Sequence, residues 1–141
     1  MNIIFMLMAI LAGVFTTIEA SINSQLGKYV TPGVATLHSL LTGMTFILIL
    51  NILNGNILKY QKVTQVSPIW LIGGLFGALI IYLSSKSIPV LGISNTLILI
   101  ISAELLCSLV IEAIIINQAI SVRKVLGLIV FLVGAIIYLQ E

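Results

Sequence analysis

Five apolar segments, each long enough to cross a lipid bilayer, take up most of this sequence. They occupy residues 3–26, 33–53, 68–85, 90–116 and 121–139, and short polar segments separate them. A membrane-spanning helix needs about 20 apolar residues, so five spans use about 100 residues and leave only short connections. The sequence therefore predicts one all-α integral membrane domain, residues 1–141, with five transmembrane helices and no extramembrane domain.

The composition supports this class and excludes several others. Of the 141 residues, 60% are hydrophobic and 7% are charged, whereas a soluble domain has roughly a quarter of its residues charged. A net charge of +2 is too small and too scattered for a nucleic-acid partner. With no aspartate, one histidine and one cysteine, a single copy cannot assemble a zinc site or an aspartyl dyad. We therefore expect no enzyme, no metal and no cofactor, and we interpret Cys107 as a small buried hydrophobe.

Proline and polar residues predict where the helices begin and end. Pro32 and Pro68 suit the first turn of a helix, where no backbone N–H is needed. Residues 86–89 close the third span, residues 117–118 end the fourth, and Ser121 caps the fifth. Residues 54–67 form the longest polar connection.

Basic residues are nearly balanced across the predicted membrane. Five crossings put the two chain ends on opposite sides, with four basic residues on the N-terminal side and two on the other: Lys59, Lys62, Arg123 and Lys124 against Lys28 and Lys86. The positive-inside rule then favours a cytoplasmic N-terminus. Because the margin is two residues, we expect that the chain can also insert both ways round.

Glu104 is the most informative polar residue, because it lies near the middle of the fourth span. An ionised side chain at that depth costs about 2.5–3.5 kcal/mol, so Glu104 must be neutral, paired or in contact with water. Ser108 and Glu112 follow at i+4 and i+8, on the same face. We interpret Glu104 as a proton- or cation-binding carboxylate with Ser108 beside it; the alternative is a protonated glutamate that only bonds a neighbouring helix. Glu112, one turn from the end of the span, suits the headgroup level.

Glu19 is the second candidate for proton or substrate binding. It shares one stripe of the first helix with Thr16 at i−3 and Asn23 at i+4. Counting from Ile3 places it about 24 Å into a core about 30 Å thick, nearer the far side than the middle. The alternative is an interfacial glutamate that caps polar neighbours. His38, early in the second span, is a candidate proton relay, although a structural histidine is the commoner case.

Two pairs of glycines predict helix packing. Gly73 and Gly77 form a G-x-x-x-G spacing, and Gly127 and Gly134 repeat after seven residues, so each pair gives one helix a face of small residues. Such faces let helix backbones approach closely. The sequence does not decide between packing within one copy and packing between copies.

The order of these features resembles the YdcZ-like family of the drug/metabolite transporter superfamily. The first part of the match is Gly13, Ile22-Asn23, Leu26-Gly27, Pro32, Ala35, Ser39 and Gly43. The later parts are residues 68–78, 89–92, 104–109 and 124–127. Together these segments cover essentially the whole chain. Two positions depart from the family pattern, because glutamine is commoner where Glu104 stands and an uncharged polar residue is common where Glu19 stands.

The resemblance implies a fold and a partner. Members of this family are half-size transporters with five helices, and their larger relatives contain two inverted five-helix repeats. The resemblance therefore implies a multi-pass protein of the bacterial inner membrane that pairs with an inverted second copy or a paralogue. Smaller four-helix multidrug transporters of the same superfamily use a helix-one glutamate for protons and cations in alternation, which suggests that role for Glu19.

Three functions are compatible with these sequence features. The first is a secondary transporter, an exporter or a permease as in the family it resembles, that moves a small polar or cationic solute with proton coupling as an antiparallel dimer. The second is a passive channel for a small ion or solute, with the same polar residues at a constriction. The third is a membrane assembly subunit that transports nothing. We expect the first, with no nucleic acid among its partners.

Overall fold

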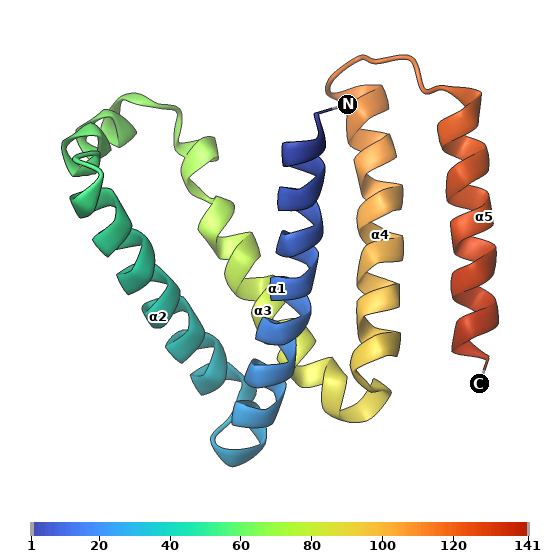
Figure 1. Ribbon diagram of the computed structural model, residues 1–141, viewed down its shortest axis with the longest axis horizontal. Coiled ribbons are helices and arrows are strands. Elements are labelled where there is room, and N and C mark those ends of the chain that lie inside the picture. Colours follow the sequence, from blue (N-terminus) through green and yellow to red (C-terminus); the bar gives the residue numbers. More distant parts are fainter. Residues whose placement is uncertain (1, 141) are drawn as a thin grey trace. The chain divides into compact units, whose positions relative to one another are not determined.

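The computed structural model describes residues 2–140, and within that range the regular structure is entirely helical (Figure 1). Five of its helices are long and apolar enough to cross a membrane, which confirms the predicted all-α fold with five spans. The chain divides into two compact units, Met1–Val90 and Leu91–Glu141. Each unit is described by itself below.

The first unit begins with a helical hairpin of α1 (Ile3–Tyr29) and α2 (Pro32–Leu53). Thr31 caps α2, because its hydroxyl accepts a hydrogen bond from the N–H of Val34, and Pro32 occupies the first turn as predicted. Gly27 lies at this return of the chain, where a Cβ would be in ordinary van der Waals contact with the Cα of Pro32 at 3.5 Å. The first helix continues three residues beyond its predicted end.

The polar connection and the third span differ from the prediction. Two 3-10 helices, η1 (Ile57–Gln65) and η2 (Pro68–Leu71), precede α3 (Gly73–Leu91). The third helix was expected to end at residue 85, but α3 continues through Lys86 and Pro89. Proline is accommodated because it lies in the last turn, where its missing N–H leaves only one carbonyl without its helical donor. Gly92, with φ of 84°, follows directly and ends the helix.

The second unit is a hairpin of α4 (Ile93–Ile114) and α5 (Val122–Leu139). The fourth helix begins three residues later and ends two residues earlier than predicted. Asn117, with φ of 54°, lies in the connection, where asparagine tolerates the left-handed conformation. Ser121 caps α5 as predicted, since its hydroxyl accepts a hydrogen bond from the N–H of Arg123.

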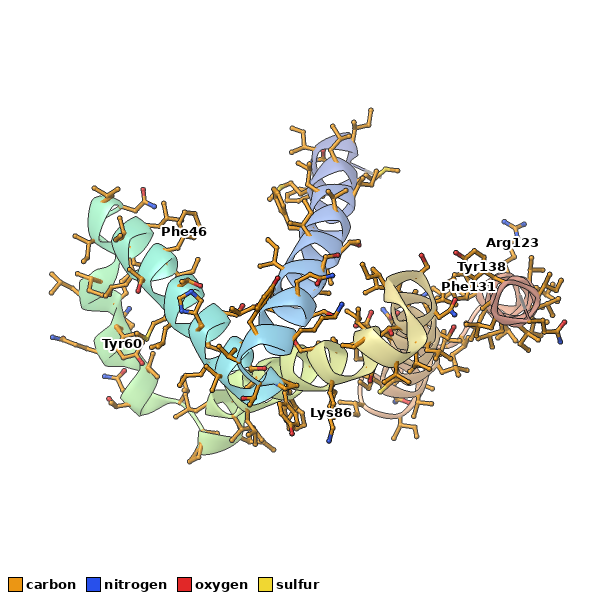
Figure 2. The ribbon with its side chains drawn as sticks, turned by 90° about the horizontal axis from the view of Figure 1, so that it is seen from below. Phe46, Tyr60, Lys86, Arg123, Phe131 and Tyr138 are labelled. Carbon is orange, nitrogen blue, oxygen red and sulfur yellow. The ribbon has the colours of Figure 1, made fainter. Side chains whose placement is uncertain are left out.

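Apart from Ile88, the buried residues of the described chain are small or polar, and most large apolar side chains are exposed (Figure 2). The buried set consists of Ala20, Ala35, Ile88, Ala135, Asn23, Ser24, Thr36, Ser84, Ser85 and Thr96. This arrangement is expected of membrane helices, which associate through small residues and hydrogen bonds because lipid tails already solvate the apolar side chains. Cys107 is exposed, so the interpretation of this residue as buried was wrong: its helix position faces out of the unit.

Candidate functional site

Three polar side chains connect α1 to α2 within the first unit. The amide Nδ2 of Asn23 donates to Ser39 Oγ at 3.1 Å, and Ser39 Oγ donates to Glu19 Oε1 at 3.0 Å. We call Glu19, Asn23 and Ser39 the α1–α2 polar cluster. The cluster brings together two residues predicted from the sequence as binding residues and one, Ser39, that was not.

The local geometry of the hairpin explains why these residues meet. Glu19 and Asn23 are four residues apart, so they lie on one face of α1. Asn23 and Ser39 are each eight residues from Thr31, and in an antiparallel hairpin positions equally far from the turn lie at the same height. The backbones can approach here because small residues, Ala20 and Ala35, are buried nearby on the two helices.

Glu19 lies in the interior of α1. The helix has 27 residues, so it is about 40 Å long and its midpoint is Thr16. Glu19 lies three residues from this midpoint, which is about 4.5 Å along the axis. Because α1 begins at Ile3 as predicted, the count of about 24 Å from that end is unchanged. The depth of Glu19 in the membrane stays a prediction.

The hydrogen bonds of the cluster leave the charge of Glu19 uncompensated. Ser39 donates its one hydroxyl proton to the carboxylate, and Asn23 supplies a neutral donor to Ser39. Among residues 2–140, no basic side chain forms an ion pair with Glu19. A carboxylate inside a span with only neutral partners retains the capacity to bind a proton or a cation.

The second unit contains a groove between α4 and α5 with an ion pair at one end. Lys124 Nζ lies 2.6 Å from Glu112 Oε2, and the two side chains are 55% and 30% exposed. The cavity has a volume of about 310 Å³, and its lining is mostly apolar: Leu105, Ser108, Leu109, Glu112, Lys124, Gly127, Leu128 and Phe131. Glu112 lies in the last turn of α4 and Lys124 in the first turn of α5, where each charge alone would oppose its helix dipole. Pairing them offsets both effects.

Comparison with known proteins identifies the kind of membrane protein. The family model described as "Putative inner membrane exporter, YdcZ" matches residues 4–137. The chain belongs to the YdcZ family. No curated protein and no solved structure matches it. The YdcZ family is one of inner membrane exporters of the drug/metabolite transporter type, so the predicted resemblance, the transporter class and the multi-pass inner-membrane location are confirmed. An exporter moves its solute without converting it, which agrees with the expected non-enzymatic class.

In this YdcZ-family chain, the other predicted carboxylate is placed differently from Glu19. Glu104 is near the middle of α4 and exposed, and no hydrogen bond or ion pair joins its carboxylate to another described residue. Ser108 donates its hydroxyl to the carbonyl of Leu105 in its own helix at 2.9 Å. Ser108 and Glu112 line the groove of the second unit, whereas Glu104 does not. Of the three residues predicted to share one face, two therefore line the same cavity and Glu104 does not.

Thr16 and His38 lie beside the polar cluster in sequence but are not bonded to it. The hydroxyl of Thr16 donates to the carbonyl of Ala12 in its own helix. His38 lines a shallow depression of about 390 Å³ on α2 with Leu41, Thr42, Thr45, Phe46 and Ile49. No hydrogen bond between side chains joins the His38 ring to the cluster in the described part of the chain. Its relay role stays a prediction.

The four glycines predicted to pack against helices lie on open surface within the chain. A Cβ built on Gly73, Gly77, Gly127 or Gly134 meets no atom within 4 Å. Gly127 contributes to the floor of the α4–α5 groove. Since nothing within the glycines' own units occupies these faces, their packing role stays a prediction.

Sequence reasoning missed Ser39 as a functional residue because serine is common in membrane helices and carries no charge. The family motif contains it, but the residue alone indicates nothing about its partner. The signal that could have found it is its separation from Thr31 in the sequence, which is eight residues, as it is for Asn23. Once the turn is located, this equality predicts that the two side chains lie at one height.

Proposed function

We propose that this protein is a proton-coupled exporter of a small polar or cationic solute, with Glu19 as the carboxylate that binds the proton and the solute in turn. The observation that carries the proposal is the hydrogen bond from Ser39 Oγ to Glu19 Oε1 at 3.0 Å. It orients a carboxylate inside the first membrane-spanning helix while leaving its charge without a cationic partner among residues 2–140.

The cluster suits alternating occupancy. With Glu19 ionised, its carboxylate accepts from Ser39 and attracts a cation. When Glu19 takes up a proton, the negative charge that held the cation is removed and the solute is released. The same carboxyl group cannot satisfy both ligands at once, so inward proton movement and outward solute movement are coupled. Rocking of two repeats around such a site is the usual way in which secondary transporters expose it to each side in turn.

Glu104 is the second carboxylate of the proposal. Its polar neighbour is Ser108, and the polar neighbour of Glu19 is Asn23. The exposed position of Glu104 near the middle of α4 is costly against lipid. An inverted second copy, or an inverted paralogue, would cover this position and the open glycine faces. We therefore propose that the working transporter is an antiparallel dimer.

The test uses the full chain reconstituted in liposomes that contain a trapped pH-sensitive dye. A proton gradient is imposed, and tetraphenylphosphonium or choline is added as the cationic probe. We expect probe-dependent proton movement that falls at least tenfold in Glu19→Gln and in Glu104→Gln. Thr42→Val is the matched control, because the Thr42 hydroxyl bonds only to carbonyls of its own helix. Unchanged proton movement in both glutamine variants would refute the mechanism.

A further inference from the structure

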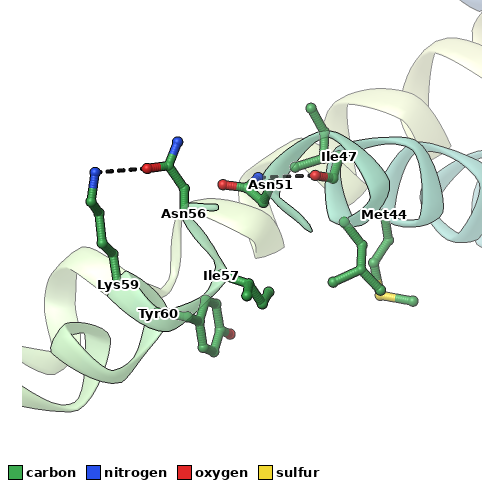
Figure 3. Close-up of a pocket in the computed structure, with 8 residues that line it drawn as sticks. Met44, Ile47, Asn51, Asn56, Ile57, Lys59 and Tyr60 are labelled. Carbon is green, nitrogen blue, oxygen red and sulfur yellow. Dashed lines mark hydrogen bonds between the residues drawn. The ribbon is translucent and has the colours of Figure 1, made fainter. Parts of the chain in front are cut away.

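A cavity of the first unit lies where α2 ends and η1 begins (Figure 3). It has a volume of about 540 Å³. Its apolar wall consists of Met44, Ile47 and Leu48 from α2 and Ile57 from η1, and its polar side consists of Asn51, Asn56, Lys59 and Tyr60. We call this cavity the α2–η1 pocket. It takes no part in the proton and solute mechanism proposed above.

The polar side of the pocket carries a positive charge that nothing in the unit neutralises. Lys59 Nζ donates to Asn56 Oδ1 at 2.7 Å (Figure 3). This neutral acceptor orients the ammonium group but leaves its full charge and two of its three hydrogens for another partner. Lys62 adds a second charge on the same short helix. The only acidic residue of the first unit is Glu19 on α1, and no ion pair with Lys59 or Lys62 occurs in the described chain.

The basic residues at the start of α5, Arg123 and Lys124, are arranged differently. There the ammonium group of Lys124 is paired with Glu112 at 2.6 Å, which cancels its charge. Lys59 therefore differs from Lys124 in having no carboxylate partner among the described residues, and its charge remains available to a bound anion.

The end of α2 does not supply the missing negative charge either. Three of its last four carbonyl groups are already occupied: the N–H of Asn54 bonds to Leu50, that of Gly55 to Ile52 and that of Asn56 to Asn51. Helix C-termini repel anions through such carbonyls when they are free. Here the chain turns back and satisfies three of them.

We propose that the α2–η1 pocket binds one anionic phospholipid, with the headgroup phosphate on Lys59 and an acyl chain against the apolar wall. Met44, Ile47 and Leu48 are spaced at i, i+3 and i+4, so the wall is one face of a membrane-spanning helix and continues into the lipid-facing surface. Basic pockets beside membrane helices are a common form of anionic lipid recognition. Tyr60, which is exposed, has the amphipathic character found at the headgroup level.

Charge complementarity decides between this occupant and the alternatives. A zwitterionic lipid carries a cationic group that Lys59 and Lys62 would repel. The exposed surface of a second copy would have to provide an acidic side chain, and the sequence contains only four acidic residues. Of these, Glu112 is paired with Lys124, and Glu19 and Glu104 lie in the interior of α1 and α4, away from the helix ends where this pocket lies.

The test measures lipids that remain bound to the full-length protein after purification in mild detergent, by native mass spectrometry. The protein is first equilibrated with equal amounts of phosphatidylglycerol and phosphatidylcholine. We expect wild-type protein to retain phosphatidylglycerol preferentially, with one molecule held most tightly per chain. Each basic residue near an anionic membrane surface contributes about a fivefold preference, so Lys59→Ala should weaken retention about fivefold and the double change with Lys62→Ala about 25-fold.

Two further variants separate a pocket from a general charge effect. Lys86→Ala removes the same charge from α3, outside the pocket, and should leave the tightly held lipid in place. Ile47→Trp fills the apolar wall without altering charge and should displace the lipid while circular dichroism shows unchanged helix content. The proposal is overturned if phosphatidylglycerol has no advantage in wild-type protein, or if Lys86→Ala matches Lys59→Ala. It is also overturned if glycerol phosphate competes as strongly as the intact lipid, because the apolar wall would then contribute nothing.

Discussion

Replacing Ser39 with alanine removes the side chain at the centre of the α1–α2 polar cluster and should destabilise the hairpin. Two hydrogen bonds between helices are lost, one from Asn23 and one to Glu19. Such bonds in membrane proteins contribute about 0.6 kcal/mol on average and at most about 1.7 kcal/mol. Asn23 is only 4% exposed, and leaving a buried polar group without its partner costs about 1–3 kcal/mol, a range that already includes the lost bond. We therefore expect the free energy of unfolding to fall by about 1–3 kcal/mol.

The assay is unfolding of the purified protein in mixed micelles by increasing sodium dodecyl sulfate, followed by circular dichroism. Asn23→Ala, Ser39→Ala and the double variant form a double-mutant cycle that isolates their mutual interaction. The expected coupling free energy is about 0.6–1.7 kcal/mol. Thr42→Val serves as the control, since it removes a hydroxyl one turn along α2 that bonds only within its own helix.

Two results would refute the reasoning about the cluster. A coupling free energy below about 0.3 kcal/mol is what independent sites show, and it would mean that Asn23 and Ser39 do not interact in the membrane. Equal destabilisation by Ser39→Ala and Thr42→Val would mean that any hydroxyl of α2 matters equally. In either case the orientation of Glu19 would need another cause.

Three further predictions concern other parts of the chain. Glu112→Gln should destabilise the second hairpin by no more than about 1 kcal/mol, because its partner Lys124 is 55% exposed. Adding Lys124→Met should restore part of this loss in the same unfolding assay. If the losses of the two single variants simply sum in the double variant, the ion pair does not contribute to stability. Gly27→Ala should be neutral or stabilising, because its Cβ would lie at an ordinary 3.5 Å from Pro32, whereas Gly27→Leu should impair folding as judged by monodisperse yield. Single cysteines at Asn2 and Gln140, in a background without Cys107, should each react with an impermeant thiol reagent in about half of the molecules if the chain inserts both ways; labelling of one end only would exclude an inverted homodimer.

The helices were largely predictable from the sequence because lipid imposes a simple rule on length and polarity. Five apolar segments sufficed to predict five spans. The helix starts follow local preferences: Thr31 and Ser121 cap α2 and α5, and Pro32 occupies the first turn of α2. The third span was less predictable. Residues 86–89 were interpreted as a stop, yet α3 runs to Leu91, since a proline in the last turn of a helix interrupts very little.

The candidate site was only partly predictable. Helical spacing grouped Glu19 with Asn23 on one stripe, and these two residues do lie in one hydrogen-bonded cluster. The same spacing grouped Thr16 with them, but Thr16 bonds to its own backbone. Periodicity tells which residues share a face, and it does not tell which face meets the neighbouring helix.

The α2–η1 pocket was not visible in the sequence at all. Lys59 and Lys62 read as a solvated polar connection, and Asn51, Asn56 and Met44 had no evident relation to them. The pocket exists because the chain turns back at residues 54–56 and folds η1 against the end of α2.

By itself the sequence determined the membrane class, the number of spans and the chemistry available inside the membrane, because these depend on composition and on local spacing. Only the tertiary structure decided which polar groups are partners. It joined Ser39 to Glu19 and Asn23, paired Lys124 with Glu112, and left Lys59 and Glu104 without an opposite charge in the described chain. The physical reason is that a hydrogen bond or an ion pair between helices depends on their relative height and rotation, which contacts between small residues set and no single helix encodes.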